Sequence, residues 1–363
     1  NLFFKKQNMK KKSLNAKKIT HKNLLKYLKN PKIKIIYKSF ERLLVNNKLS
    51  GNLAVAVSGG PDSMALTFLA RCYSIIKHVK IKYYHLDHRL RENSYKEAKS
   101  LKLNLKKFDI NCKIITWKGK KPKSNVQSIA RKIRYNLLVN ECIKDKVKTI
   151  LIAHHIDDLY ESFIIRLLRG SGLKGLTSFS NLSSEFKHNS NIKILRPLIY
   201  QNKKNLLYTA KKVFNFYIND SSNENILFKR VRVRNLINNL KNEGLDEKKL
   251  KLTIDNLTDS NITINYYVKE NIRLNANFVN SGRKLKCIIN KKFFDNPKEV
   301  IFRSMGDILR YIGKNYYAPR GKSVINLLNR IGSENFNKTT LSGCIIEKIN
   351  NSVIIYGEKS KKI

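Results

Sequence analysis

Apolar runs of strand length alternate with amphipathic stretches of helix length over residues 53–169. The strand-like runs, rich in β-branched and aromatic residues, cover residues 53–57, 79–85, 112–117 and 149–153. Each is followed by apolar residues at helical spacing, first from residue 62 onward and then over residues 92–108, 126–143 and 157–169. Strands that alternate with helices of this length predict an α/β fold with a doubly wound parallel sheet.

Both ends of the chain lack this alternation. The opening residues, to about residue 37, carry no acidic side chain and only a short helical pattern near Leu24 and Leu28, which predicts a basic arm. Beyond about residue 235 the pattern predicts a smaller α+β domain. Its expected pieces are a polar helix, β-like segments, a second helix and two paired strands, over residues 239–259, 262–293, 323–331, 339–347 and 352–356. We therefore divide the chain into an N-terminal arm (1–48), a central domain (49–236) and a C-terminal domain (237–363).

The charge of the chain indicates a polyanionic partner. Its 363 residues include 74 Lys and Arg against 26 Asp and Glu, a formal net charge of +48. Such a charge attracts polyanions and raises encounter rates, so nucleic acid is the expected partner. A solvated, lysine-rich surface without a partner is the alternative interpretation. Because no apolar run approaches membrane-spanning length, we expect no membrane partner.

The cysteines are scattered and form no Cys-x-x-Cys pair. They are Cys72, Cys112, Cys142, Cys287 and Cys344. This spacing indicates neither a disulfide framework nor a zinc or iron–sulfur site. It suits a reducing compartment, so we expect a cytoplasmic protein, with an organellar compartment left open. The oligomeric state is also left open, a homodimer being one alternative.

A glycine-containing turn follows the first predicted strand and leads into a helix. It consists of Ser58, Gly59, Gly60, Pro61, Asp62 and Ser63. Two glycines permit positive φ and close approach of a ligand to bare backbone, and proline suits the first position of a helix. The helix N-terminus adds unpaired N–H groups and partial positive charge, so the turn is a candidate phosphate cradle. The Gly-x-x-x-x-Gly-Lys-Ser/Thr motif of nucleoside triphosphatases is absent. A plain strand-to-helix turn is the alternative.

Polar clusters follow the second and fourth predicted strands. Residues 85–91 place Asp87, Arg89 and Arg91 where doubly wound sheets contact the adenine and ribose of a nucleotide, although a polar loop whose charges satisfy one another is the alternative. Arg131 and Arg134 are three residues apart and share a face of the next helix. They are suited to a polyphosphate or a carboxylate, or they form a solvated basic face.

The cluster after the fourth strand, residues 154–161, contains two histidines and three carboxylates. Asp157 and Glu161 are four residues apart and are expected to face the same way, with Asp158 turned aside. Carboxylates beside a triphosphate commonly hold Mg²⁺. Ordinary acidity at a helix N-terminus is the alternative, and zinc is a weaker one because the histidines are adjacent.

An arginine-rich segment lies at the end of the central domain. Arg230, Arg232 and Arg234 alternate with valines shortly after residues 220–223. Guanidinium groups spaced in this way are suited to RNA phosphates, and a structural hinge is the alternative.

The turn at residues 58–63 resembles the signature of the PP-loop ATP pyrophosphatases. Further segments in order, His-Leu-Asp-His-Arg-Leu-Arg, Ala-Arg-x-x-Arg-Tyr, Ala-His-His-x-Asp-Asp-x-x-Glu, Arg-Gly-Ser-Gly, Arg-Pro-Leu and Asp-x-Ser-Asn, resemble the tRNA(Ile)-lysidine synthetase family. The resemblance covers residues 54–234, and residues 317–320 and 340–344 are similar to the C-terminal region of that family with lower specificity. Val231 departs from it, standing where the family usually has Asn, and the N-terminal arm is longer than typical.

The resemblance implies a ligase that forms a C–N bond and converts ATP to AMP and diphosphate. ATP would adenylate the C2 oxygen of the wobble cytidine of tRNA(Ile) with a CAU anticodon. The amine of free L-lysine would then displace AMP, which changes codon specificity from AUG to AUA. The central domain is then the PP-loop ATP pyrophosphatase catalytic domain, and the C-terminal domain binds tRNA or substrate.

The resemblance also implies roles for single residues. Residues 58–63, Asp87, Arg131 and His154 would bind ATP. Asp62 and Asp157 would hold Mg²⁺ and act in catalysis with Glu161, which would hold the lysine ammonium. The arginines expected to contact tRNA are Arg89, Arg91, Arg230, Arg232 and Arg234.

Two other functions remain open from the sequence. A PP-loop enzyme with sulfur chemistry, such as a tRNA cytidine thiolase, is the nearest rival, but such enzymes commonly use a cysteine pair that this chain lacks. A non-catalytic basic RNA-binding protein on the same fold is the second. Only the ligase requires lysine.

Overall fold

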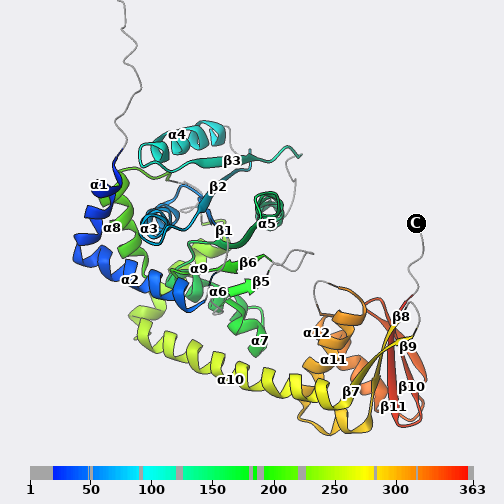
Figure 1. Ribbon diagram of the computed structural model, residues 1–363. Helices are drawn as coiled ribbons and strands as arrows, with labels where there is room; N and C mark the ends of the chain where they lie inside the picture. The colour runs from blue at the N-terminus through cyan, green and yellow to red at the C-terminus, as the bar shows by residue number, and fades with distance from the viewer. Residues whose placement is uncertain are drawn as a thin grey trace, which may run out of the picture. The chain divides into compact units, whose positions relative to one another are not determined.

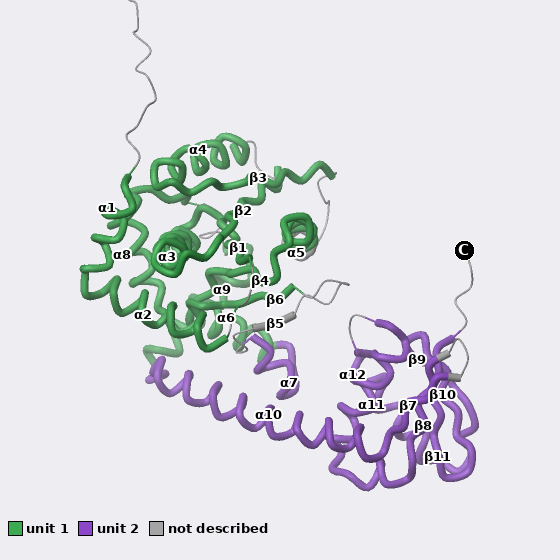
Figure 2. Tube along the Cα trace, in the orientation of Figure 1, with its two compact units in different colours: residues 1–168, 181–243 green, residues 169–180, 244–363 purple. Residues whose placement is uncertain are grey.

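A computed structural model, shown in Figure 1, describes residues 19–47, 49, 52–89, 93–119, 126–179, 183–185, 192–219, 226–281, 284–315 and 318–358. The chain divides into two compact units (Figure 2). Unit 1 comprises residues 1–168 and 181–243, and unit 2 comprises residues 169–180 and 244–363.

Unit 1 contains the predicted doubly wound sheet. Its strands among the described residues are β1 (Asn52–Ala56), β2 (Ile81–Asp87), β3 (Cys112–Thr116), β4 (Val147–Leu151), β5 (Ser183–Glu185) and β6 (Lys193–Leu195). Their order is β3-β2-β1-β4-β6-β5, with every neighbouring pair parallel except β5 and β6. The order reverses between β1 and β4, and the carboxyl ends of strands at such a point are where doubly wound sheets bind ligands.

Helices cover both faces of this sheet. They are α1 (His21–Lys26), α2 (Pro31–Asn46), α3 (Pro61–Lys77), α4 (Ser94–Lys106), α5 (Val126–Lys144), α6 (Ile156–Leu167), α8 (Lys203–Phe214) and α9 (Lys229–Asn242). Because side chains alternate along a strand, Val55 joins a core with Phe40 and Phe68. Its neighbour Ala54 joins the core on the opposite face with Leu138. The sheet is therefore buried on both faces, as the near-continuous apolar strands require.

The described part of the predicted N-terminal arm is helical and belongs to unit 1. Asn30 caps α2, since its side chain accepts hydrogen bonds from the N–H groups of the next turn. Ile33, Ile36 and Phe40 recur at helical spacing and are at most 1% exposed. The lysines between them hid this amphipathic pattern from the sequence interpretation. Residues 1–18 lie outside the described residues.

Unit 2 is a smaller α+β unit with its own core. Its elements are α7 (Leu173–Leu176), α10 (Glu247–Asn275), β7 (Ala276–Ser281), β8 (Lys284–Ile289), α11 (Lys298–Ile312), α12 (Gly321–Ile331), β9 (Lys338–Leu341), β10 (Cys344–Ile349) and β11 (Ser352–Gly357). The strands form an antiparallel sheet in the order β7-β8-β11-β10-β9. Within this unit, Lys174 Nζ lies 3.4 Å from Asp307 Oδ1 and links α7 to α11. The separate α+β unit is confirmed.

One expectation for this unit was wrong. Residues 262–275 continue helix α10, although their β-branched and aromatic residues had suggested short strands. The buried residues of α10 follow helical spacing and not the alternation of a strand: Leu250, Ile254 and Val268 are buried, while Ile262, Tyr266 and Tyr267 face solvent. In the described part of the chain, no helix combines the length and apolar character needed to cross a membrane.

Replacing Phe40 with alanine tests the packing of α2. Phe40 is fully buried and meets the ring of Tyr73 edge to face at 6.1 Å. We expect F40A to lower the free energy of unfolding by about 3–5 kcal/mol, because it removes a buried ring and leaves a cavity. I35A is the matched control on the same helix, since Ile35 is 68% exposed. Denaturant unfolding of both variants measures the difference, and equal stabilities would show that α2 is not part of the core.

Candidate active site

The turn between β1 and α3 is held by hydrogen bonds around one serine. Ser63 Oγ accepts from the Gly59 N–H and the Ser58 hydroxyl, each at 3.0 Å, and donates to the Gly60 carbonyl at 2.9 Å. Gly59 has φ +94°, and a Cβ placed there would lie 2.5 Å from Ile218 Cδ1. Ile218 N–H also donates to the Gly59 carbonyl at 2.9 Å. Conformation and space therefore both require glycine at this position.

Helix α3 begins directly after the turn. Gly60 is its N-cap, Pro61 occupies its first turn without an N–H group to satisfy, and Asp62 follows. The unpaired N–H groups and partial positive charge of this helix end lie at the carboxyl end of β1, beside the reversal of strand order. The predicted residues 58–63 thus lie at a helix N-terminus that directly follows the carboxyl end of a strand.

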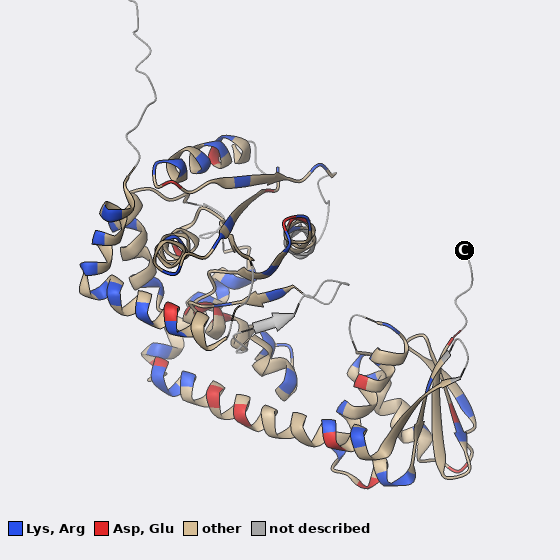
Figure 3. Ribbon diagram, in the orientation of Figure 1, with Lys and Arg blue, Asp and Glu red and all other residues tan. Residues whose placement is uncertain are grey.

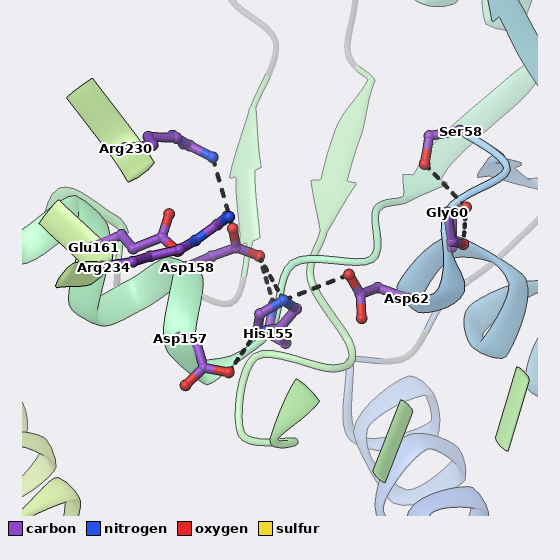
Figure 4. Close-up of polar contacts among 10 residues, drawn as sticks. Ser58, Gly60, Asp62, His155, Asp157, Asp158, Glu161, Arg230 and Arg234 are labelled. Carbon is purple, nitrogen blue, oxygen red and sulfur yellow. Dashed lines mark hydrogen bonds and ion pairs between the residues drawn. The ribbon is translucent and has the colours of Figure 1, made fainter. Parts of the chain in front are cut away.

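His155 brings α3 and α6 together through three carboxylates (Figure 4). Its ring nitrogens lie 3.5 Å from Asp62 Oδ2, 3.4 Å from Asp157 Oδ2 and 3.6 Å from Asp158 Oδ2. The residue is only 5% exposed. The sequence interpretation had assigned His154 to ATP binding and had given His155 no role. The alternating directions of two adjacent side chains at the end of β4 were the available signal.

The charge of this cluster depends on the imidazole of His155. Burial alone lowers the pKa of His155, but the contacts with Asp157, Asp62 and Asp158 outweigh it and raise that pKa to about 10. The ring is therefore a cation at neutral pH. In turn, the contact with His155 holds the pKa of Asp157 below its usual value. The second oxygen of Asp62, Oδ1, is buried and has no hydrogen-bond partner.

Asp158 is not turned aside as predicted. Its Oδ2 accepts from the His155 N–H at 3.1 Å, and its Oδ1 lies 3.6 Å from Arg230 Nη1 on α9. Residues three apart on a helix are neighbours, so Glu161 follows on the same side and meets Arg234, with Nε at 2.5 Å from Oε1. Glu161 is 2% exposed, and burial raises its pKa although Arg234 opposes this. Its Oε2 is buried without a hydrogen-bond partner.

The other predicted nucleotide residues lie at the neighbouring strand ends. Asp87, at the end of β2, is 1% exposed; its Oδ1 accepts from the Arg89 N–H at 2.9 Å and its Oδ2 has no hydrogen-bond partner. His154 Nδ1 accepts a hydrogen bond from Arg196 Nε at 3.2 Å. Arg196 is buried, and the sequence interpretation gave it no role. Arg91 lies outside the described residues. So does the side chain of Arg131, whose backbone is part of α5.

The donors of this cluster fit a magnesium ion better than a zinc ion. In the regions that the structure describes, no group of three or more His, Cys, Asp or Glu side chains is arranged to hold a metal. Mg²⁺, however, is commonly held by one or two carboxylates and completed by phosphate oxygens and water. Asp62 and Asp157 converge on His155, and the unpaired Asp62 Oδ1 remains to accept a ligand.

Gly59 provides a test of the turn. G59A forces a side chain to φ +94° and into Ile218, so we expect a loss of about 1–3 kcal/mol in the free energy of unfolding. G60A is the matched control, because Gly60 has φ −68° and a Cβ there would meet nothing closer than 3.8 Å. Thermal unfolding without nucleotide compares the two, and a G59A protein as stable as G60A would contradict the strain.

The pKa of His155 predicts a pH-dependent stability. Because that pKa rises from 6.5 to about 10 on folding, protonated His155 stabilises the fold fully below pH 6.5, and the contribution is lost as pH rises through about 10. The difference in free energy of unfolding between wild type and H155Q should therefore shrink from about pH 7 to about pH 10.5. Denaturant titrations in EDTA measure it, and a constant difference would mean that the ring is neutral throughout.

Comparisons with known proteins agree with this geometry. A PP-loop domain family matches residues 32–241. The tRNA(Ile)-lysidine synthase of Wolbachia sp. subsp. Brugia malayi is 33% identical over 325 residues, which is 87% of this chain and 72% of the relative. The enzyme of the same name from Rickettsia felis is 31% identical over 340 residues, covering 91% of this chain and 75% of the relative.

A solved structure shares the fold. The U34-tRNA thiolase NcsA from Methanococcus maripaludis, which contains a [4Fe-4S] cluster, aligns with a TM-score of 0.52 and 19% identity. The alignment covers 63% of this chain and 79% of that one. At this identity the likeness concerns the PP-loop fold alone. The sequence relatives carry the finer assignment: the chain belongs to the tRNA(Ile)-lysidine synthase family.

Proposed function

We propose that the chain ligates lysine to C2 of the wobble cytidine of tRNA(Ile) with a CAU anticodon, at the expense of ATP. The cytidine O2 attacks the α-phosphate of ATP, and diphosphate leaves. The amine of lysine then attacks C2, the C2–O bond breaks, and AMP leaves. Membership of the lysidine synthase family carries this proposal, together with the contact of Asp62 on the PP-loop helix with His155.

The turn at residues 58–63 binds the diphosphate part of ATP in this proposal. Backbone N–H groups and the α3 N-terminus stabilise the charge that develops on the leaving group. His154 is directed by the Arg196 guanidinium and binds a phosphate oxygen, and Arg131 is a second phosphate ligand. The unpaired Oδ2 of Asp87 contacts the nucleoside at the end of β2.

Asp62 and Asp157 hold Mg²⁺ in this proposal. The ion supplies charge neutralisation at the phosphate oxygens when bound. Asp62 lies on α3 and Asp157 lies on α6. The buried cation His155 contacts both carboxylates and holds them in place. The lowered pKa of Asp157 keeps it ionised and able to bind the metal.

Glu161 binds the ammonium of lysine in this proposal. Only Oε1 is paired with Arg234, while Oε2 is buried without a hydrogen-bond partner. An unpaired buried carboxylate oxygen is costly, and a bound ammonium removes that cost. Burial raises the pKa of Glu161 by disfavouring its charged form, and a nearby cation such as an ammonium favours that form.

The basic surface attracts tRNA in this proposal. Lys and Arg lie on most elements of both units and outnumber acidic residues (Figure 3). Arg89, Arg91 and Arg232 contact RNA, and the C-terminal domain assists them. The relatives are bacterial, so the proposal places the reaction in the cytoplasm. It also includes a homodimer as the oligomeric state.

The cysteines favour ligation over the rival thiolation chemistry. All five are free and buried, and burial raises the thiol pKa of Cys72 and Cys112 to about 12. Thiols in such surroundings are inert as nucleophiles or persulfide carriers.

Two carboxylate variants test the proposal. Diphosphate release should need both tRNA and lysine, and D62N and D157N should reduce it by about 100-fold or more, because each loses charge at the site of phosphoryl transfer. D255N is the control, since Asp255 is 43% exposed on α10 and pairs with Lys251. Mass analysis of tRNA nucleosides after incubation with labelled lysine identifies the product. Release without lysine would indicate the thiolase, and no release would indicate an RNA-binding protein.

A further inference from the structure

Helix α9 presents its arginines to two different surroundings. Arg230 and Arg234 are one turn apart and face α6, where Asp158 and Glu161 are also about one turn apart. Arg232 points elsewhere, and its Nη1 donates to the carbonyls of Ile226 and Leu227 at 3.0 and 2.8 Å. Two of the three arginines thus form a ladder of opposite charges between α6 and α9.

We propose that Arg230 and Arg234 are positioning residues of the catalytic site rather than RNA contacts. They hold Asp158 and Glu161 in place, and through them His155 and the orientation of the lysine-binding oxygen. This inference rests on the proposed function for the identity of the reaction that the two residues support.

Arg230 acts through Asp158. Asp158 Oδ1 lies 3.6 Å from Arg230 Nη1, while Oδ2 accepts from the His155 N–H and lies 3.6 Å from Nε2 of the ring. The same ring contacts Asp62 and Asp157. The side chain of Asp158 is 12% exposed, so water screens it poorly. Without the cation on α9, Asp158 would compete with the other carboxylates for His155 and shift the ring.

Arg234 acts through Glu161. The guanidinium Nε holds Oε1 at 2.5 Å, and this contact fixes the direction of the unpaired Oε2. A guanidinium is planar and its N–H directions are rigid, whereas a lysine ammonium is a flexible point charge. An Arg→Lys change at this position therefore keeps the charge and loses the direction.

The charge of the cluster shows why both arginines are needed. Asp62, Asp157 and Asp158 contact His155, and Glu161 lies about one turn after Asp158 on α6. Arg230 and Arg234 each place a guanidinium beside one carboxylate of this group, Asp158 and Glu161 respectively. Removing either arginine leaves an uncompensated buried carboxylate, which is strongly unfavourable.

The experiment compares R230K and R234K, and the charge-removing variants R230Q and R234Q, with R71K. Arg71 is a matched control because it also pairs with a carboxylate of unit 1, Asp109 at 2.7 Å, and has no role in the proposed site. Steady-state diphosphate release gives kcat and KM for ATP and lysine. Calorimetry gives the Kd of ATP with Mg²⁺, and fluorescence anisotropy gives the Kd of tRNA from about 50 to about 300 mM salt. Thermal unfolding identifies any variant that is merely unstable.

For positioning residues, we expect R230K and R234K to lose about 10- to 100-fold in kcat/KM, as outer-shell partners of active-site ligands do. R234K should act mainly on the KM for lysine, and R230K on kcat and on ATP binding. The Kd of tRNA should match that of wild type in these variants, its salt dependence should be unchanged in R230Q and R234Q, and R71K should retain wild-type kinetics.

A different pattern overturns the inference. If R230Q and R234Q, which lose the charge, weaken tRNA binding and reduce its salt slope by about one unit each, with kcat unchanged at saturating tRNA, the two arginines are phosphate contacts. Equal losses of activity in R71K would show that the effect is a general loss of stability and not a loss of positioning at the site. If the wild-type enzyme did not need lysine, the proposed function would be refuted instead. The Kd of ATP for R230K would still test the positioning role in that case.

Discussion

A buried imidazolium is the interaction on which the active site depends. His155 draws the N-terminal ends of α3 and α6 together because carboxylates from both helices contact its ring. Without a cation there, Asp62, Asp157 and Asp158 would repel one another. The parallel sheet makes the arrangement available, since β1 and β4 are neighbours and end at the same edge. The turn at residues 58–63 and the acidic cluster are thus joined by electrostatics as well as by the fold.

The same constraint explains why this strongly basic chain keeps a few carboxylates buried. Asp158 and Glu161 lie within reach of arginines, not lysines. Guanidinium groups retain their charge when partly buried and fix the direction of a carboxylate. Lysine is the commoner cation in this chain, so these arginines mark places where the direction of a polar contact matters. Arg196, which donates to His154, is a further example.

The sequence predicted the periodic elements of unit 1 well, because strands and helices with clean hydrophobic periods leave little choice of fold. It misjudged residues 21–46 and 262–275, where lysines and β-branched residues obscured helices whose buried positions are few. For the site, residues 58–63 and 154–161 could be found from their places after strands. The partners of Asp158 and Glu161 could not, because helix α9 follows about seventy residues later and only folding decides which of its faces meets α6.

Residues 169–180 connect two elements of unit 1 but belong to unit 2, so the chain passes between the units at residues 168–169, 180–181 and 243–244. No single cut separates the molecule into halves that each retain all their own packing partners. A fragment that ends at residue 243 would keep Thr177 and Phe179, which are buried, but lose helix α10, which contacts their segment. Exchange of the C-terminal region between relatives would accordingly have to include residues 169–180 as well as the residues after 243, because both segments belong to unit 2.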